Sequence, residues 1–166
     1  MIPRDPRIGA EFSPCRQYRY RLWRQWNAER AKALFVLLNP SMADETQNDP
    51  TVERCERRAR MWGYGGVEVV NLFAYRSTDP KVLYRVSEPI GMMNDEAILI
   101  ATIDAGIVIC GWGEHGAHLR RGQAVLDLLS SDGTMLTKIY HLGLNASGQP
   151  KHPLYISYRV LPMRFN

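Results

Sequence analysis

The chain has 166 residues, of which 45% are hydrophobic and 23% are charged, and its formal net charge is +4. A chain of this length is expected to form one α/β domain over residues 1–166, with residues 1–17 as an N-terminal arm. No apolar run approaches the roughly 20 residues of a membrane span, and the N-terminus lacks the apolar core of a signal peptide. These features predict a cytoplasmic protein without a membrane partner.

The three cysteines are widely scattered along the chain, at Cys15, Cys55 and Cys110. This spacing excludes a disulfide framework and a CxxC metal-binding motif. The thiols are therefore expected to be reduced, in agreement with a cytoplasmic location.

Positive charge is concentrated near the N-terminus. Residues 1–32 contain eight Lys or Arg and three Asp or Glu, whereas the remaining residues contain 13 basic and 14 acidic side chains. The stretch YRYRLWRQW, residues 18–26, alternates apolar with charged side chains, which is typical of a half-exposed strand. Its Arg19, Arg21 and Arg24 are candidates for contacts with the phosphates of a nucleic acid. The alternative is a charged strand face that meets only solvent.

Strands and helices alternate along the rest of the chain. The turn NAER is expected to reverse the chain, so that residues 18–26 and 33–38 form an antiparallel hairpin. Asp49 and Pro50 predict the N-cap and the first position of a helix that ends at Gly63. Further elements are expected as strands at residues 67–75, 105–110 and 138–144, a helix capped by Asn94, a helix over residues 116–133, and an irregular tail after Pro150.

Strands that alternate with helices predict an α/β fold, because parallel neighbours need a crossover connection that is usually helical. Near-continuous apolar runs such as LFVLL and AGIVIC indicate strands that are buried on both faces. We therefore predict a three-layer α/β/α sandwich with a mostly parallel central sheet and an N-terminal antiparallel edge hairpin.

Polar side chains follow each of the predicted buried strands. The strand ends carry the sequences NPS, FAYRSTDP, GWGEHG and LNASGQPKHP. Ligands of open parallel sheets bind outside the carboxyl ends of the strands, so these residues are expected to line one crevice. The candidates are Asn39, Ser41, Asn71, Tyr75, Arg76, Trp112, His115, Asn145 and His152. The alternative is that each sequence forms an ordinary turn.

Asn39 ends an apolar strand, and its amide can donate and accept hydrogen bonds at the same time. Such a group can hold a water molecule or pair with the edge of a nucleobase. The aromatic side chains of Tyr75 and Trp112 are candidates for stacking on a base, whereas Phe73 is expected in the core. The residue types therefore favour a nucleobase or nucleotide as the ligand.

Other kinds of chemistry find less support in the sequence. GWGEHG matches G-x-G-x-x-G, but it follows the third buried strand, and no acidic residue ends the next strand to hold a ribose. We therefore expect no cofactor. Glu114, His115 and His118 lack a further ligand at a suitable distance, so no metal is expected. Ser41 has no evident general base, which leaves acyl transfer without support.

The runs LLNPSMADETQNDPTVERC, WGYGGVEVVNLFAYRSTDP and GWGEHG resemble a bacterial and phage family known mainly as a domain of unknown function. This resemblance covers most of the chain, from the strand at Tyr18 to His152. The family name implies no reaction.

A more distant resemblance connects the chain with the uracil-DNA glycosylase superfamily, whose members are α/β/α sandwiches. LLNPS is similar to the first motif of that superfamily, and the similarity implies that Asn39 positions water or contacts the base. VVNLFAYRSTDP is similar to a middle segment in which Asn71 would read the base. KHPLY is similar to a late His-Pro-Ser motif in which His152 would stabilise the departing base. The chain departs from these motifs because it has no glycine at Leu37 or Leu38 and no serine at position 154.

Three functions compete at this point. The first is hydrolysis of an N-glycosidic bond, with Asn39 and His152 as catalytic residues. The second is a non-catalytic module that binds a nucleotide or a single strand. The third is a protein-interaction domain that uses the N-terminal hairpin. The sequence leaves open the identity of the base, the choice between DNA, RNA and free nucleotide, and the oligomeric state.

Overall fold

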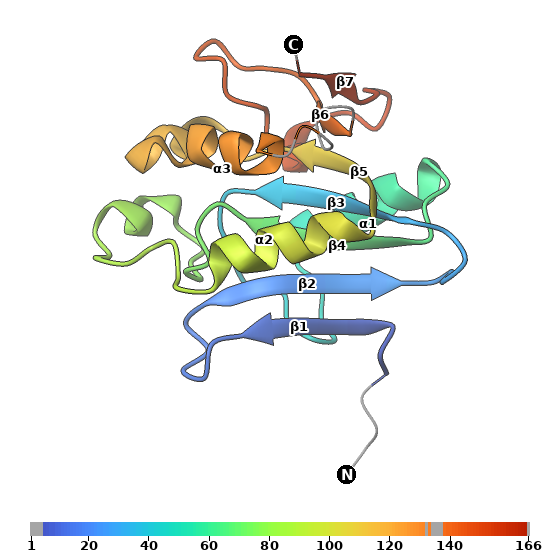
Figure 1. Ribbon diagram of the computed structural model, residues 1–166, viewed down its shortest axis with the longest axis horizontal. Coiled ribbons are helices and arrows are strands. Elements are labelled where there is room, and N and C mark those ends of the chain that lie inside the picture. The colour runs from blue at the N-terminus through green and yellow to red at the C-terminus, as the bar shows by residue number, and fades with distance from the viewer. Residues whose placement is uncertain (1–4, 132, 134–137, 166) are drawn as a thin grey trace.

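The protein forms a mixed α/β fold around a seven-stranded sheet with the order β1-β2-β4-β3-β5-β6-β7 (Figure 1). The computed structural model describes residues 5–131, 133 and 138–165. The strands are β1 (Ile8–Phe12), β2 (Arg19–Gln25), β3 (Lys32–Leu37), β4 (Gly66–Asn71), β5 (Ala105–Cys110), β6 (Ile139–His141) and β7 (Met163–Arg164). The α-helices are α1 (Pro50–Met61), α2 (Asn94–Ile103) and α3 (Arg121–Ser130), and the 3₁₀ helices include η1 (Pro80–Tyr84), η2 (Glu114–Arg120) and η4 (Pro153–Tyr155).

The sheet is mixed, which corrects the expectation of a mostly parallel sheet. The pairs β4–β3, β3–β5 and β5–β6 are parallel, as expected for strands joined through α1, α2 and α3. The pairs β1–β2, β2–β4 and β6–β7 are antiparallel. The parallel core is therefore limited to four strands, and antiparallel strands extend it on both sides.

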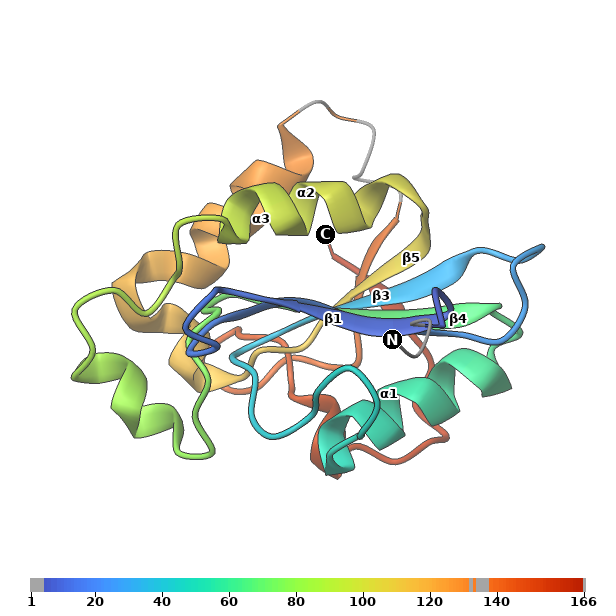
Figure 2. The same cartoon turned by 90° about the horizontal axis from the view of Figure 1, so that it is seen from below.

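Helices cover both faces of the sheet. Figure 2 shows α2 and α3 on one face and α1 on the other. Strand β3 is buried on both sides because its side chains alternate between two cores. Leu34 and Val36 pack in the core under α2 and α3, whereas Phe35 and Leu37 pack in the core under α1. The apolar run that predicted a doubly buried strand is confirmed.

The predicted hairpin between residues 18–26 and 33–38 is wrong. Strand β2 pairs with β1 and β4, and β4 separates it from β3. The connection between β2 and β3 wraps around the start of β4, where Trp26 and Asn27 donate backbone hydrogen bonds to the carbonyl of Gly65. A Cβ at Gly65 would lie 2.1 Å from the carbonyl oxygen of Asn27, so this wrap requires glycine. Residues 1–17, predicted as an arm, contain the edge strand β1.

The helix beginning at Pro50 is confirmed, with Asp49 as N-cap accepting a hydrogen bond from the Val52 amide. The predicted cap Asn94 is instead the first residue of α2, and Met93 occupies the cap position. Asn94 is fully buried and donates to the carbonyls of Asn71 and Leu72 at 2.8 and 3.0 Å. It therefore ties α2 to the end of β4, which is a tertiary role that the local pattern does not reveal.

The helix predicted over residues 116–133 is divided into η2 and α3. Leu119 and Arg120 adopt left-handed backbone conformations with φ of 54° and 53°, and these residues break the helix. After the break, Arg121 is buried and donates to the Leu72 carbonyl at 2.8 Å and to Asp95 at 2.5 Å. The break thus orients α3 so that its first residue, Arg121, connects the helix to the end of β4 and to α2.

Candidate functional site at the carboxyl edge of the parallel strands

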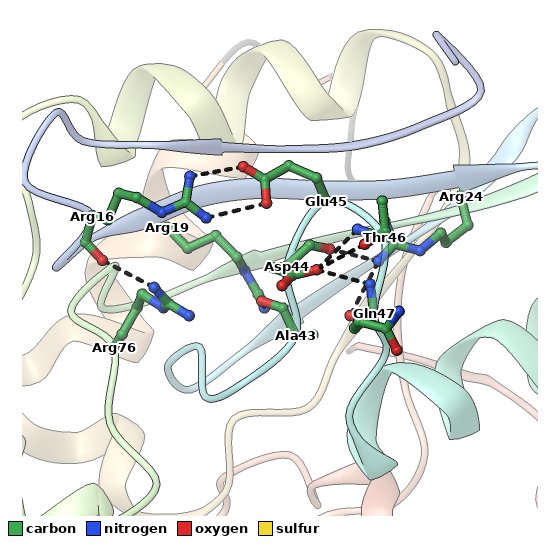
Figure 3. Close-up of polar contacts among 9 residues, drawn as sticks. All are labelled: Arg16, Arg19, Arg24, Ala43, Asp44, Glu45, Thr46, Gln47 and Arg76. Carbon is green, nitrogen blue, oxygen red and sulfur yellow. Dashed lines mark hydrogen bonds and ion pairs between the residues drawn. The ribbon is translucent and has the colours of Figure 1, made fainter. Parts of the chain in front are cut away.

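The loop that follows β3, residues 38–49, is held in place by arginines from β2 (Figure 3). Arg19 donates to the carbonyl of Ala43 at 3.0 Å. Arg24 donates to the carbonyl of Asp44 at 2.6 Å and to the side chain of Asn48 at 3.0 Å. We call Arg19 and Arg24, with their acceptors in this loop, the arginine clamp.

Both clamp arginines are buried, with exposed fractions of 2% for Arg19 and 5% for Arg24. Burial lowers the pKa of Arg19 to about 10, and it also lowers the pKa of Arg24. A pKa near 10 still leaves the Arg19 guanidinium charged at neutral pH. The two guanidinium groups therefore hold the loop from its buried side, because the backbone carbonyls of the loop are the acceptors that a buried guanidinium needs.

Strand β2 does not present a free arginine face, and this corrects the predicted surface of Arg19, Arg21 and Arg24. Arg21 pairs with Glu68 at 2.6 Å and with Glu11 at 3.2 Å. A β-bulge in β2 decides the side of the sheet on which Arg19 lies. Glu11 of β1 pairs with Arg21, and the next residue of β1, Phe12, pairs with Arg19. The extra residue turns Arg19 to the same side of the sheet as Arg24, although five positions separate them.

Two further arginines hold the outer side of the same loop (Figure 3). Arg16 forms an ion pair with Glu45 at 2.8 Å. Arg76, a predicted ligand residue, donates to the carbonyls of Ser41 at 3.4 Å and Arg16 at 3.1 Å. Ser41 is half-buried, and the structure shows its carbonyl as the acceptor of Arg76. These contacts fix the position of the loop beside the strand ends.

Asn71 lies on the α1 face of the sheet, and Asn39 lies two residues beyond the end of β3. Side chains alternate across a strand, and Leu37 and Val69, each two residues earlier, belong to the core under α1. Leu37 and Asn71 are also Cα partners in the β3–β4 ladder. The topology therefore brings the two residues to the same edge of the sheet.

The two amides differ in how they are satisfied. Asn39 is half-buried and donates from Nδ2 to the carbonyls of Ser77 at 2.9 Å and Pro40 at 3.2 Å. Asn71 is 1% exposed, and neither Nδ2 nor Oδ1 finds a hydrogen-bond partner among the residues that the structure describes. Leaving such a group unsatisfied costs about 1–3 kcal/mol, so Asn71 is an unusual residue for a strand end.

The segment that carries His152 lies across the end of β5 on the same face. A Cβ at Gly111 would lie 3.1 Å from the carbonyl oxygen of Lys151, 3.1 Å from Cδ of Pro153 and 3.4 Å from Leu37. Helix α1 holds this segment through Arg54, which donates to the carbonyl of Pro153 at 3.2 Å. The neighbours of His152 in sequence thus meet the strand that precedes Asn39.

His152 has a defined protonation state at neutral pH. Its Nδ1 accepts a hydrogen bond from the Leu154 amide at 3.2 Å. Burial lowers the pKa of His152 to about 4, although the charge of Asp49 acts in the opposite direction. Since Nδ1 is the acceptor, the single proton of the neutral ring resides on Nε2. The imidazole is therefore a neutral hydrogen-bond donor.

The other predicted ligand residues have varied surroundings. Trp112 is 1% exposed and donates from Nε1 to Gln149 at 2.8 Å, which places it in the core. The Oδ1 of Asn145 accepts hydrogen bonds from the backbone amides of Ser147 and Gln149 and so stabilises a turn. These contacts engage the indole N–H of Trp112 and the Oδ1 of Asn145 within the fold.

Tyr75 lies in the connection that follows β4, and His115 lies in η2, which follows β5. Tyr75 forms an isolated β-bridge with Tyr18, and the two rings meet edge to face at 5.6 Å. His115 shares a hydrogen bond of 2.9 Å with the hydroxyl of Tyr84, whose ring also lies 4.1 Å from that of His118. Among the described residues, no group of three or more His, Cys, Asp and Glu side chains could hold a metal ion.

Sequence reasoning missed a set of exposed basic side chains in the connections that follow β4, β5 and β6. The set is Lys81, Arg85, Arg120 and Lys151. None of them forms an ion pair with any residue in the described part of the chain. Their scatter along the sequence hides them from a search for basic runs, although each follows a predicted strand end.

A comparison with protein-family models matches residues 19–154 of the chain to a family described as a protein of unknown function, DUF1643. The match leaves out both edge strands, β1 and β7. No curated protein and no solved structure gave a significant match. No helix among the described residues is long and apolar enough to cross a membrane.

Proposed function

We propose that this chain, which belongs to the DUF1643 family, binds a nucleobase-bearing ligand at the carboxyl edge of its parallel strands, on the face covered by α1. The ligand is a nucleotide or a single strand of nucleic acid. We call Asn39, Asn71 and His152 the carboxyl-edge site. The observation that carries the proposal is the amide of Asn71, which is buried and has both polar atoms unpartnered among the described residues.

An unpartnered amide at a strand end is suited to a base. The edge of a nucleobase presents neighbouring donors and acceptors, and an asparagine side chain can meet one of each. Without a ligand, the amide of Asn71 lowers stability, and a bound base would supply the missing partners. A resemblance to the uracil-DNA glycosylase superfamily also gives Asn71 the role of reading a base.

The charges around the edge support an anionic ligand. Four exposed basic residues follow the ends of β4, β5 and β6, and they lack ion pairs with other described residues. Lys151 directly precedes His152 in sequence. Phosphates at this rim would neutralise these side chains, and affinity would then fall with added salt. The earlier candidates on β2 are replaced by this set.

The experiment is a thermal-shift screen of free nucleobases, nucleotides and short oligonucleotides against the wild-type protein and the variant Asn71→Leu. A ligand that binds only the native state raises the melting temperature. We expect at least one base-bearing ligand to stabilise the wild type and to have no effect on Asn71→Leu. A ligand that shifts both proteins equally, or a complete absence of shifts, would contradict the proposal.

A second candidate function is hydrolysis of an N-glycosidic bond, and the state of His152 favours it. The neutral ring has its proton on Nε2 and can donate a hydrogen bond to a departing base. In this reaction water adds to the anomeric carbon of the sugar, the bond to the base breaks, and the base leaves with the electron pair and a proton. Asn39 would position the water, as the resemblance to the glycosylase superfamily implies.

Two variants of His152 separate the catalytic role from a structural one. Asparagine keeps an acceptor where Nδ1 lies, and glutamine keeps an N–H donor where Nε2 lies. Release of free base from uracil-containing and other oligonucleotides measures the reaction. For an enzyme, we expect His152→Asn to lose turnover and His152→Gln to retain part of it. Equal turnover in both variants would remove His152 from the reaction, and ligand binding without turnover in the wild type would leave binding as the function.

A further inference from the structure

A second concave surface lies on the opposite face of the sheet, between the β1–β2 turn and helix α2. Its cavity volume is about 1220 Å³. The lining includes the rings of Phe12, Tyr18 and Tyr20, and the side chains of Met92, Met93 and Ile100. The Tyr18 and Tyr20 rings are stacked, with centroids 6.4 Å apart and planes 9° apart. We call this surface the α2 groove.

Large apolar side chains continue from the groove along the outer side of α2. Ile100 is 43% exposed, Leu99 is 41% exposed and Ile103 is 75% exposed. Residues spaced by three and four positions share one face of a helix, so these three form a single stripe. Met92 is 95% exposed at the start of the same stripe. Contiguous apolar surfaces of this kind are typical of sites that meet another molecule.

The charged residues of the groove are all acidic. Glu11, Glu88 and Glu96 line it, and no Lys or Arg does so. Glu88 and Glu96 form no ion pair within the described part of the chain, and Glu11 shares only the 3.2 Å contact with Arg21. Carboxylates beside aromatic rings attract a cation through both its charge and the ring faces.

We propose that the α2 groove is a docking site for a partner protein segment that combines apolar side chains with lysine or arginine. The apolar side chains of the segment would cover Leu99, Ile100 and Met92, and a cationic group would lie over the tyrosine rings between Glu88 and Glu96. The three carboxylates disfavour a nucleic acid or an anionic membrane at the same place. This proposal is independent of the carboxyl-edge site, which lies on the other face of the sheet.

Part of the groove lies outside the family match. The match begins at residue 19, whereas the groove includes Glu11, Phe12, Cys15 and Tyr18. One wall therefore belongs to a segment that the family description does not cover.

Fluorescence polarisation with labelled short peptides tests the proposal. The probe is a peptide of alternating leucine and lysine, and the control probe alternates leucine and glutamate. We expect the basic peptide to bind the full chain and the acidic peptide to fail. The double variant Glu88→Gln and Glu96→Gln should weaken binding of the basic peptide by about tenfold, since two partly exposed charge contacts are lost.

A matched variant controls for the change in net charge. Glu29→Gln with Glu114→Gln removes two exposed carboxylates away from the groove, and it should leave the affinity for the basic peptide unchanged. Ile100→Ser tests the apolar contribution and should also weaken binding. Equal binding of both peptides, no binding of the basic peptide, or equal effects of the two double variants would overturn the proposal. The proposal would also be overturned if the protein bound anionic vesicles or an oligonucleotide, and if the double variant Glu88→Gln with Glu96→Gln bound them more tightly.

Discussion

The carboxyl-edge site and the α2 groove lie on opposite faces of one sheet, and they differ in almost every physical property. At the carboxyl-edge site, Asn71 is buried without polar partners among the described residues, and four exposed basic side chains lie in the connections that follow β4, β5 and β6. The α2 groove is open, aromatic and acidic. The net charge of +4 describes neither surface. The comparison teaches that the local pairing of charges, rather than their sum, decides which partner each surface attracts.

The largest expected effect comes from the arginine clamp, because only the carboxyl-edge site depends on it. Arg24→Met removes the guanidinium that donates to Asp44 and Asn48, and it leaves these partly buried acceptors unpaired. We expect the free energy of unfolding to fall by about 3–5 kcal/mol. Ligands of the carboxyl-edge site should no longer bind at a temperature where the variant is folded, whereas a peptide bound to the α2 groove should be unaffected.

Arg7→Met is the control for the clamp, since Arg7 is exposed and, among the described residues, forms its ion pair with Asp5. Urea denaturation of both variants measures the difference. Equal stabilities of the Arg24 and Arg7 variants would show that the clamp does not hold the loop.

A smaller difference in the free energy of unfolding is expected between variants of two neighbouring buried asparagines, Asn94 and Asn71. Asn94 donates to the carbonyls of Asn71 and Leu72, so Asn94→Leu should cost about 2–3 kcal/mol. The Asn71 side chain has no such bonds among the described residues, and Asn71→Leu should therefore change stability by less than about 1 kcal/mol or increase it. Chemical denaturation of the two variants provides the measurement. A large loss of stability in Asn71→Leu would mean that the amide is satisfied in the folded protein.

Acidification should weaken the carboxyl-edge site through His152. The pKa of His152 in the folded protein is about 4, below the usual value of 6.5, so the unfolded chain binds the proton more tightly. Stability is therefore complete above pH 6.5 and is lost as the pH falls toward 4, by about 3 kcal/mol. His152→Asn should have a shallower dependence of unfolding free energy on pH in this range. Identical pH profiles would show that His152 does not contribute.

The smallest effect uses the cysteines to report on the α2 groove without changing stability. Cys15 is exposed at the groove, and a hydrogen bond from Ser13 is the largest cause of its lowered pKa. Burial raises the pKa of Cys55 and Cys110. We expect a maleimide to label only Cys15 in the native protein and all three thiols in denaturant, as read by mass spectrometry. The basic peptide should slow the labelling of Cys15, and a ligand of the carboxyl-edge site should not.

Local sequence patterns predicted the central elements of the fold. The four parallel strands are confirmed, and the apolar runs of three of them reflect burial on both faces. The start of α1 is confirmed because Asp49 and Pro50 act within one turn. The pairing of β2 was wrong, since its partners β1 and β4 are chosen by packing across the whole sheet.

The candidate site was predicted less completely than the fold. The positions of Asn39 and Asn71 at strand ends follow from the pattern, but the missing partners of Asn71 depend on every residue around it. The arginines of β2 looked like an exposed face because their acceptors are mostly backbone carbonyls, which no residue type reveals. That Asn39, Asn71 and His152 share one ligand stays a prediction.

The bulge in β2 makes the number of residues between Arg19 and Arg24 matter as much as their identity. Insertion or deletion of one residue between Arg21 and Arg24 would leave an odd number of ladder steps between Arg19 and Arg24 and turn Arg19 toward the opposite face, away from Ala43. Among descendants of this gene, insertions and deletions between Arg21 and Arg24 should therefore be rarer than exchanges of one amino acid for another in the same stretch.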